Sequence, residues 1–318
     1  MNTTRTERSA DVDGPAVTRM GDRVFSGIST GAAIVILLAL AGVAIFLTTE
    51  GIPGITARPD QVASGEEFLP YVWPLVYGTL MAAALALVMA VPVAIGVALY
   101  ITHYAPRQLA TLLGYLVDLL AAVPSVVYGL WGIGWLARRL VPLYEWLNST
   151  LGFLPFFAGP PSATGRTILT ASIVLAVMIL PIITAICREV FLQTPRLHQE
   201  AALALGATRW EMIRYAVLPY GRSGIVSASM LGLGRALGET MAVAMVLSAA
   251  GVVTTNLISS TNPSTIAANI ALSFKEASGL SVNALIASGL VLFVITFVVN
   301  FVARWIVNRR SEFSGADA

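Results

Sequence analysis

Six long apolar segments most strongly limit what this chain can fold into. A helix needs about 20 apolar residues to cross the hydrocarbon core of a bilayer, and soluble domains have no use for several such runs. The segments are expected at residues 24–48, 72–101, 110–137, 167–188, 223–250 and 283–307. Composition agrees, because 57% of the 318 residues are hydrophobic and only 11% are charged. We therefore predict an all-α polytopic membrane protein with six transmembrane helices.

Basic residues indicate which ends of these segments face the cytoplasm. If the N-terminus is cytoplasmic, 13 arginines fall in inside segments, whereas four arginines and the single lysine fall outside. An excess of arginine and lysine on the cytoplasmic side is the usual bias of membrane proteins. Both termini are therefore predicted to be cytoplasmic.

The expected organisation has four parts. Residues 1–22 are polar and are predicted to form a disordered cytoplasmic tail. Residues 23–70 hold the first transmembrane helix and an external loop; the helix lacks a cleavage site and should remain as an anchor. The main transmembrane domain spans 71–310 and includes a cytoplasmic loop at 189–222. Residues 311–318 are predicted to be a cytoplasmic C-terminal tail.

The cytoplasmic loop contains a predicted helix–turn–helix elbow that runs from Glu200 to Pro219. A short helix starts at Glu200, and Gly206 can take the left-handed conformation that ends it. Thr208 is predicted to cap a second helix, because Glu211 three residues later completes a capping box. Pro219 is predicted to end that helix. An elbow this short has no core of its own, so a partner or the membrane surface must hold it.

Two sequence blocks resemble a known family. In the elbow, three residues separate Glu200-Ala201-Ala202 from Gly206, and nine residues separate Gly206 from Ala-Val-Leu-Pro219. This pattern is similar to the signature cytoplasmic loop of bacterial ABC-importer permeases. The block Gly-Leu-Gly-Arg235-Ala-Leu-Gly-Glu239-Thr-Met-Ala-Val resembles the phosphate-specific (PstC) type of these permeases, as does Ala-Ala-Val-Pro-Ser-Val-Val-Tyr-Gly129. The resemblance covers most of the chain from about residue 70 onward. It departs at Ala216, where the loop motif usually has a larger aliphatic residue.

The resemblance implies a fold, a function and a set of partners. The fold would be the transmembrane domain of a type I ABC importer, and the chain would be a multi-pass permease for inorganic phosphate in a bacterial inner membrane. Its partners would be a second permease (PstA type), a pair of ATPase subunits (PstB type) and an external phosphate-binding protein (PstS type). The residues that couple to the ATPase would be Glu200, Ala201, Ala202, Gly206, Thr208, Glu211 and Pro219.

Two charges in the fifth span are the main candidates for a substrate path. Arg235 is about twelve residues into that span, and Glu239 is expected one turn further on the same helical face. A charge at a helix centre costs on the order of 2.5–3.5 kcal/mol, so neither should face lipid. The planar guanidinium offers paired donors that match two phosphate oxygens. Glu239 would compete with the anion for Arg235; the alternative is an ion pair that only locks helix packing.

Asp118 is a further charge inside a span, and Pro124 with Ser125 follows it closely. A kink with freed backbone groups is expected at this proline. Because a carboxylate repels phosphate, Asp118 is predicted to pair with Arg235 or Arg107 rather than to bind substrate. Asp118 and Ser125 are both assigned to the substrate path.

Two external segments are apolar enough to be structured. Residues 140–166 are predicted to form an interfacial or partly re-entrant segment. Residues 262–277 are predicted to form a short helix with Asn262 as its cap and Pro263 at its first position. This helix would either pack on its own protein or form a rim that receives the external binding protein.

No catalytic, cofactor or metal site is predicted. Lys275 is the only lysine, so a phosphate-binding loop of the Gly-x-x-x-x-Gly-Lys type cannot be present, and a separate subunit must hydrolyse ATP. His103 and His198 lie far apart without other metal ligands nearby, and Cys187 is the only cysteine. A net charge of +2 is too small to indicate nucleic acid.

Three alternatives to a phosphate permease stay open. The cargo could be another oxyanion, such as molybdate or sulfate. The chain could be an ion-coupled secondary transporter in which Glu239 and Asp118 titrate, although such a carrier does not need a docking elbow. It could also be a membrane scaffold or sensor that reports phosphate status to a kinase.

Overall fold

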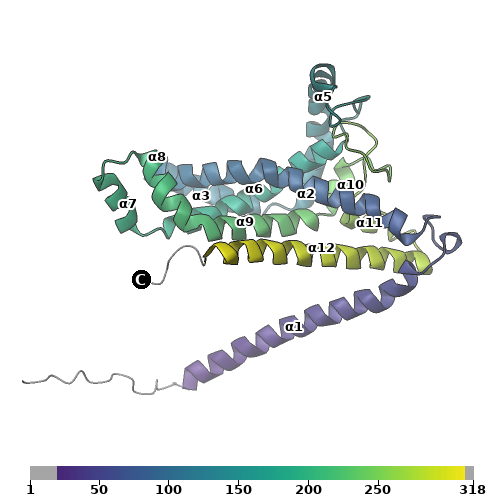
Figure 1. Cartoon of the computed structure of the whole chain (residues 1–318), viewed down its shortest axis with the longest axis horizontal. Helices are drawn as coiled ribbons and strands as arrows, with labels where there is room; N and C mark the ends of the chain where they lie inside the picture. The colour runs from purple at the N-terminus through teal and green to yellow at the C-terminus, as the bar shows by residue number, and fades with distance from the viewer. Residues whose placement is uncertain (1–19, 312–318) are drawn as a thin grey trace, which may run out of the picture. The chain divides into compact units, whose positions relative to one another are not determined.

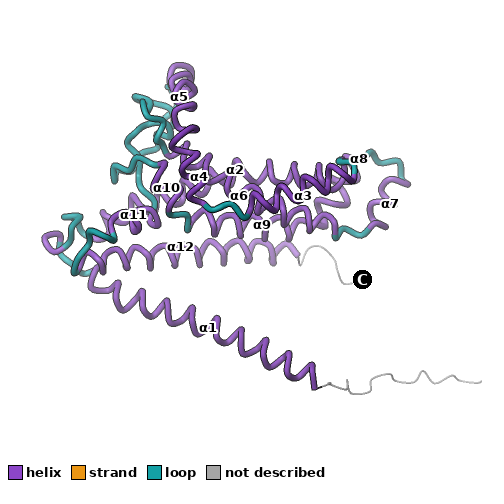
Figure 2. Tube along the Cα trace, turned by 180° about the vertical axis from the view of Figure 1, so that it is seen from behind, coloured by secondary structure: helices purple, strands orange, loops and turns teal. Residues whose placement is uncertain are grey.

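The computed structural model describes residues 20–311, without the side chains of Asp22 and of 306–311. The helices are α1 (Met20–Ile55), α2 (Phe68–Leu99), α3 (Arg107–Ala121), α4 (Ser125–Trp131), α5 (Ala137–Leu151), α6 (Ile168–Leu192), α7 (Arg196–Ala204), α8 (Arg209–Met212), α9 (Leu218–Leu237), α10 (Met241–Val246), α11 (Ile266–Ser273) and α12 (Leu280–Ser311). Over the described range there is no strand, and the all-α prediction is confirmed (Figures 1 and 2). The predicted terminal tails lie almost wholly outside this range.

Four helical segments are long and apolar enough to cross a membrane: α1, α2 with the turn after it, α6 and α12. A fifth candidate is a bent pair in which Arg107–Ala121 meets Ser125–Leu151 at 92°. The predicted span 223–250 is not one helix, because α9 ends at Leu237 and α10 starts at Met241. The count of six transmembrane helices and the side on which the termini lie therefore remain predictions.

The chain divides into two compact units, residues 1–47 and 48–318. The described part of the first unit is the N-terminal portion of α1, a continuous helix whose apolar side chains are exposed. The second unit contains the core, in which α2, α6 and α9 pack against one another (Figure 2).

Small residues let these three helices approach closely. On α2 an alanine recurs at every fourth position along the buried face: Ala82, Ala86, Ala90, Ala94 and Ala98, each at most 1% exposed. On α9 a Cβ added to Gly232 would lie 2.7 Å from Cδ1 of Ile183 on α6. Helices in lipid associate through close backbone approach rather than through a hydrophobic force, so small residues favour this packing.

The predicted third span, 110–137, is interrupted rather than kinked. Pro124 has no amide hydrogen and disfavours helical geometry in the residue before it. α3 ends at Ala121, and Pro124 is the N-cap of α4. The 92° bend shows that this proline separates two helices.

Asn262 joins segments that are distant in sequence instead of capping a helix. Its side chain is buried, accepts the amide of Ile168 at 3.1 Å and donates to the Ser248 carbonyl at 3.2 Å. The cap of α11 is Thr265, whose hydroxyl accepts the Ala268 amide at 3.3 Å. The prediction of Asn262 as cap was wrong because its amide satisfies groups distant in sequence. Of the external segment 140–166, the first part is helical and belongs to α5.

Candidate functional site

Arg235 and Glu239 lie on either side of a helix break. Arg235 is in the last turn of α9, whose C-cap is Gly238. Glu239 is only 8% exposed, and its Oε1 accepts the amide of Ala242 at 3.1 Å in the first turn of α10. The prediction that Glu239 follows Arg235 on one continuous helical face was therefore wrong. Two features favour this break. Gly238 has a low helix propensity, and the Glu239 carboxylate accepts an amide hydrogen bond in the first turn of the next helix.

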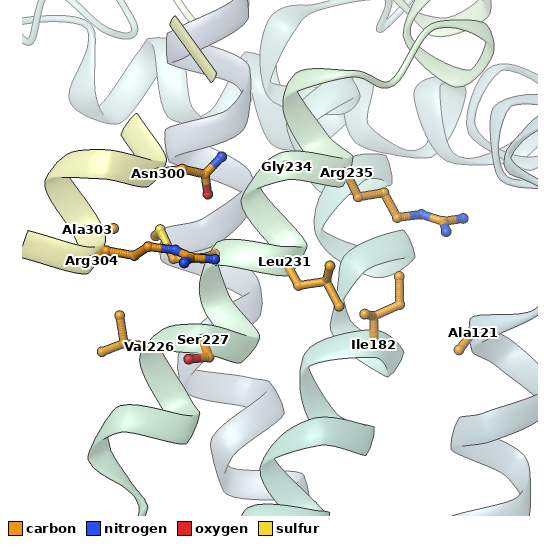
Figure 3. Close-up of a pocket in the computed structure, with 11 residues that line it drawn as sticks. Ala121, Ile182, Val226, Ser227, Leu231, Gly234, Arg235, Asn300, Ala303 and Arg304 are labelled. Atoms are coloured by element: carbon orange, nitrogen blue, oxygen red, sulfur yellow. The ribbon is translucent and has the colours of Figure 1, made fainter. Parts of the chain in front are cut away.

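Arg235 lines a cavity of about 980 Å³ in the second unit (Figure 3). The walls come from α9 and α12, with Ala121 of α3 and Ile182 of α6 opposite. Within the described residues the guanidinium has neither a hydrogen bond nor an ion pair, although it lies near enough to the Tyr128 hydroxyl for a Coulombic interaction. Its N–H donors are therefore free for an anion. A cation in the last turn of a helix also interacts favourably with the carbonyl end of that helix.

Asp118 pairs with Arg188 on α6. Nη2 of Arg188 lies 3.4 and 3.3 Å from the two carboxylate oxygens. The predicted partners Arg235 and Arg107 are therefore wrong. Sequence reasoning missed Arg188 because 70 residues separate it from Asp118; its place near the cytoplasmic end of the fourth predicted span was the only signal.

The four predicted path residues do not meet in one place. Of this set only Arg235 lines the large cavity. Ser125 starts α4, Glu239 is held at α10, and Asp118 is engaged by Arg188. A role for all four in one path is not supported by their positions in a single chain.

Part of the elbow has the local geometry that its sequence predicts, although its first helix, α7, starts at Arg196 rather than at Glu200. Gly206 follows α7 with φ +85°, in the left-handed region. The Thr208 hydroxyl accepts the Glu211 amide at 3.3 Å, and Oε2 of Glu211 accepts the Thr208 amide at 2.8 Å. These hydrogen bonds, first the one from the Thr208 amide and then the one from its hydroxyl, lower the pKa of the Glu211 carboxyl below its ordinary value. The predicted capping box is confirmed.

Pro219 does not end a helix. It lies in the first turn of α9, and the chain stays helical from Arg209 to Leu237 through a wide turn at Ile213–Val217. Proline donates no amide hydrogen, and its ring crowds the carbonyl four residues earlier. A wide turn just before it relieves that clash, so the prediction that Pro219 stops the helix was wrong. One helical stretch thus connects the elbow to the cavity.

The elbow also exposes apolar side chains. Leu205 is 90% exposed and Trp210 on α8 is 54% exposed, and Leu197 on α7, just before the elbow, is 77% exposed. Of the seven predicted coupling residues, Ala202 and Glu211 are partly buried, and the other five are exposed: Glu200, Ala201, Gly206, Thr208 and Pro219. Large apolar side chains exposed on a connecting segment indicate a surface for another protein or for the membrane interface.

Comparison with known proteins identifies the family. Residues 90–312 match the family model described as "Binding-protein-dependent transport system inner membrane component". "Phosphate transport system permease protein PstC 2" of Mycobacterium tuberculosis is 49% identical over 298 residues, which are 90% of this chain and 91% of that protein. The PstC of Mycobacterium leprae is 44% identical over 308 residues, or 93% of this chain and 96% of the other.

A solved structure supports the fold. A chain of a bacterial ABC transporter involved in the import of the acidic polysaccharide alginate aligns with a TM-score of 0.56, covering 90% of this chain and 99% of that one. At 19% identity this likeness concerns the fold alone. It agrees with the predicted transmembrane domain of an ABC importer. The chain belongs to the binding-protein-dependent transport system inner membrane components and, within them, to the PstC permeases.

Proposed function

We propose that this chain is a permease subunit of an ATP-driven importer of inorganic phosphate and crosses a bacterial cytoplasmic membrane several times. The observation that carries the proposal is its 44–49% identity, over about nine-tenths of its length, to permeases of phosphate transport systems. Arg235 supports it, because an unpaired guanidinium in a wide cavity can present paired N–H donors to an oxyanion. The chain itself is not an enzyme, since permeases of this family leave ATP hydrolysis to separate subunits.

The proposed partners follow the family resemblance. They are a second permease of the PstA type, two PstB-type ATPase subunits and an external PstS-type phosphate-binding protein. The elbow would dock on the ATPase through its exposed face, which includes Glu200, Ala201 and Leu205. Movement of the elbow would reach the cavity through the helical stretch from Arg209 to Leu237. Both termini would lie in the cytoplasm, as the distribution of arginines favours.

The two charges at the helix break are proposed to have different roles. Arg235 would contact the passing anion, because it lines the cavity and its donors are free. Glu239 would hold the start of α10 at the break, because its carboxylate is engaged by the Ala242 amide. In lipid, a broken helix is tolerated where its free backbone groups line a cavity or are satisfied by protein.

Uptake of radiolabelled phosphate tests the proposal in proteoliposomes that contain the whole complex. We expect uptake to require ATP and the external binding protein, and to be little inhibited by sulfate or molybdate. Uptake that survives ATP depletion and collapses with an ionophore would instead support an ion-coupled carrier. Preferential uptake of another oxyanion would leave the importer in place and overturn the assignment of its cargo.

A further inference from the structure

A second arginine lines the same cavity as Arg235. Arg304 projects from α12, and Figure 3 shows its side chain reaching toward α9 at the level of Leu231, with Ser227 about one turn closer to the start of α9. Asn300 lies one turn earlier on α12 and also lines the cavity. The cavity is therefore bordered by two guanidinium groups from different helices and by no carboxylate.

Arg304 has no acidic partner among the side chains that the structure describes. Two acidic residues on other helices of this unit already have partners: Asp118 pairs with Arg188, and Glu239 accepts the Ala242 amide. Asn300 donates its own amide to the Thr296 carbonyl at 2.9 Å. An arginine that lines a wide cavity, and whose N–H donors have no partner among the described residues, can bind an oxyanion.

The two arginines stand at different levels of the cavity. Figure 3 places Arg304 level with Leu231, which precedes Arg235 by four residues on α9, or about 6 Å along the helix axis. The start of α9 is continuous with the elbow. Arg304 thus lies nearer the elbow, and Arg235 lies further along the same helix.

We propose that Arg304 forms a second oxyanion contact on the elbow side of the cavity, where Ser227 also lies, and that this contact takes over the anion after Arg235. This inference rests on the proposed function. An ion path needs sites strong enough to admit the ion and weak enough to release it, and several sites in series meet both needs. The shared ligand chemistry is a phosphate group, which could belong to inorganic phosphate or to a lipid headgroup; the test separates these sources.

Protection of a cysteine at Ser227 from a neutral thiol reagent is the direct measurement. Cys187 is the only native cysteine and is fully buried, so Ser227→Cys in the assembled complex reports on the cavity. In phosphatidylcholine vesicles we expect inorganic phosphate to slow labelling about tenfold relative to chloride at equal ionic strength, the effect of one charge-assisted contact. Adding Arg304→Gln should abolish this protection. The matched control is Ser223→Cys, one turn earlier on α9 and outside the cavity lining, where phosphate should have no effect.

Lipid provides the other arm of the same experiment. If phosphatidylglycerol protects Ser227→Cys and inorganic phosphate adds nothing, Arg304 holds a lipid headgroup and the proposal is overturned. Absence of protection by inorganic phosphate also overturns it.

Transport separates a failure of this inference from a failure of the proposed function. Arg304→Gln should lower the maximal rate of phosphate uptake about tenfold, and Arg304→Lys should restore part of it. Arg107→Gln, which removes an exposed arginine at the start of α3, should leave the rate unchanged. Normal uptake with Arg304→Gln, when Arg235→Gln abolishes it, would refute only the second contact. A wild-type complex that imports no phosphate would refute the proposed function itself.

Discussion

Nη2 of Arg188 lies 3.3 Å from Oδ2 of Asp118, and this ion pair joins α6 to α3. Arg188 is near the C-terminal end of α6, and three residues connect α6 to α7. Asp118 is in the last turn of α3, just before the bend between α3 and α4. Gly114 leaves the space that Arg188 needs, since a Cβ there would lie 2.6 Å from Nη1 of Arg188. The pair therefore connects α6, the helix that leads into the elbow, to the interrupted span.

A double-mutant cycle on this pair should show a small but measurable coupling. Asp118→Asn, Arg188→Gln and the double variant are compared by thermal unfolding of the assembled complex. The side chains are 52% and 20% exposed, so we expect a coupling free energy of about 0.2–1 kcal/mol, as for partly exposed pairs. If the losses of stability in the two single variants add up to the loss in the double variant, the ion pair does not stabilise the structure.

Replacing Glu239 should separate its hydrogen bond from its charge. Glu239→Ala leaves the Ala242 amide unpaired in a buried position, which costs about 1–3 kcal/mol of stability. Glu239→Gln keeps an oxygen that accepts this amide, so its midpoint of thermal unfolding should fall much less. Equal losses of stability in the two variants would contradict the proposed capping role.

Arg235→Gln should abolish most phosphate uptake while the complex still assembles. Loss of a charge-assisted hydrogen bond costs about 1.5–3 kcal/mol, so the rate should fall about ten- to hundredfold. Co-purification of the ATPase with the variant serves as the assembly control. Uptake at the normal rate would remove Arg235 from the proposed path.

Acid should loosen the elbow through Glu211. The Thr208 amide and then its hydroxyl hold the pKa of this carboxyl below its ordinary value. A lowered pKa in the folded state means that the stabilisation is complete above the unfolded value of about 4.3 and disappears as the pH falls through the folded value. Amide hydrogen exchange at Thr208, corrected for its intrinsic pH dependence, should therefore accelerate below about pH 4. The control Glu211→Gln should show exchange without this acid step; an identical step in both proteins would exclude Glu211 as its source.

Local signals were sufficient where the partner of a residue lies within one helical turn. Thr208 and Glu211 form the predicted capping box because three residues of helix bring them together whatever the rest of the chain does. Gly206 takes the positive φ that a helix end requires. The all-α class followed from the lengths of the apolar runs, since a helix satisfies its own backbone groups in lipid.

At two positions the tertiary structure overrides the local conformational preference of the sequence. Pro219 has the chemistry of a helix stop, yet a wide turn before it absorbs the clash and the helix continues. Gly238 lies within an apolar run long enough for one span, yet α9 ends there and the buried carboxylate of Glu239 begins a new helix. In both places the same local sequence permits two conformations, and packing of the neighbouring helices selects one.

By itself, the sequence determined that this chain is helical, spans a membrane and has an elbow with a capping box, because those properties depend on composition and on contacts within one turn. Only the tertiary structure decided that Asp118 pairs with Arg188 across 70 residues, and that Arg304 faces the same cavity as Arg235. Such pairings depend on which helices pack side by side and at what register. Spacing along the chain does not encode that register, since it is set by the fit of all helices in the core at once.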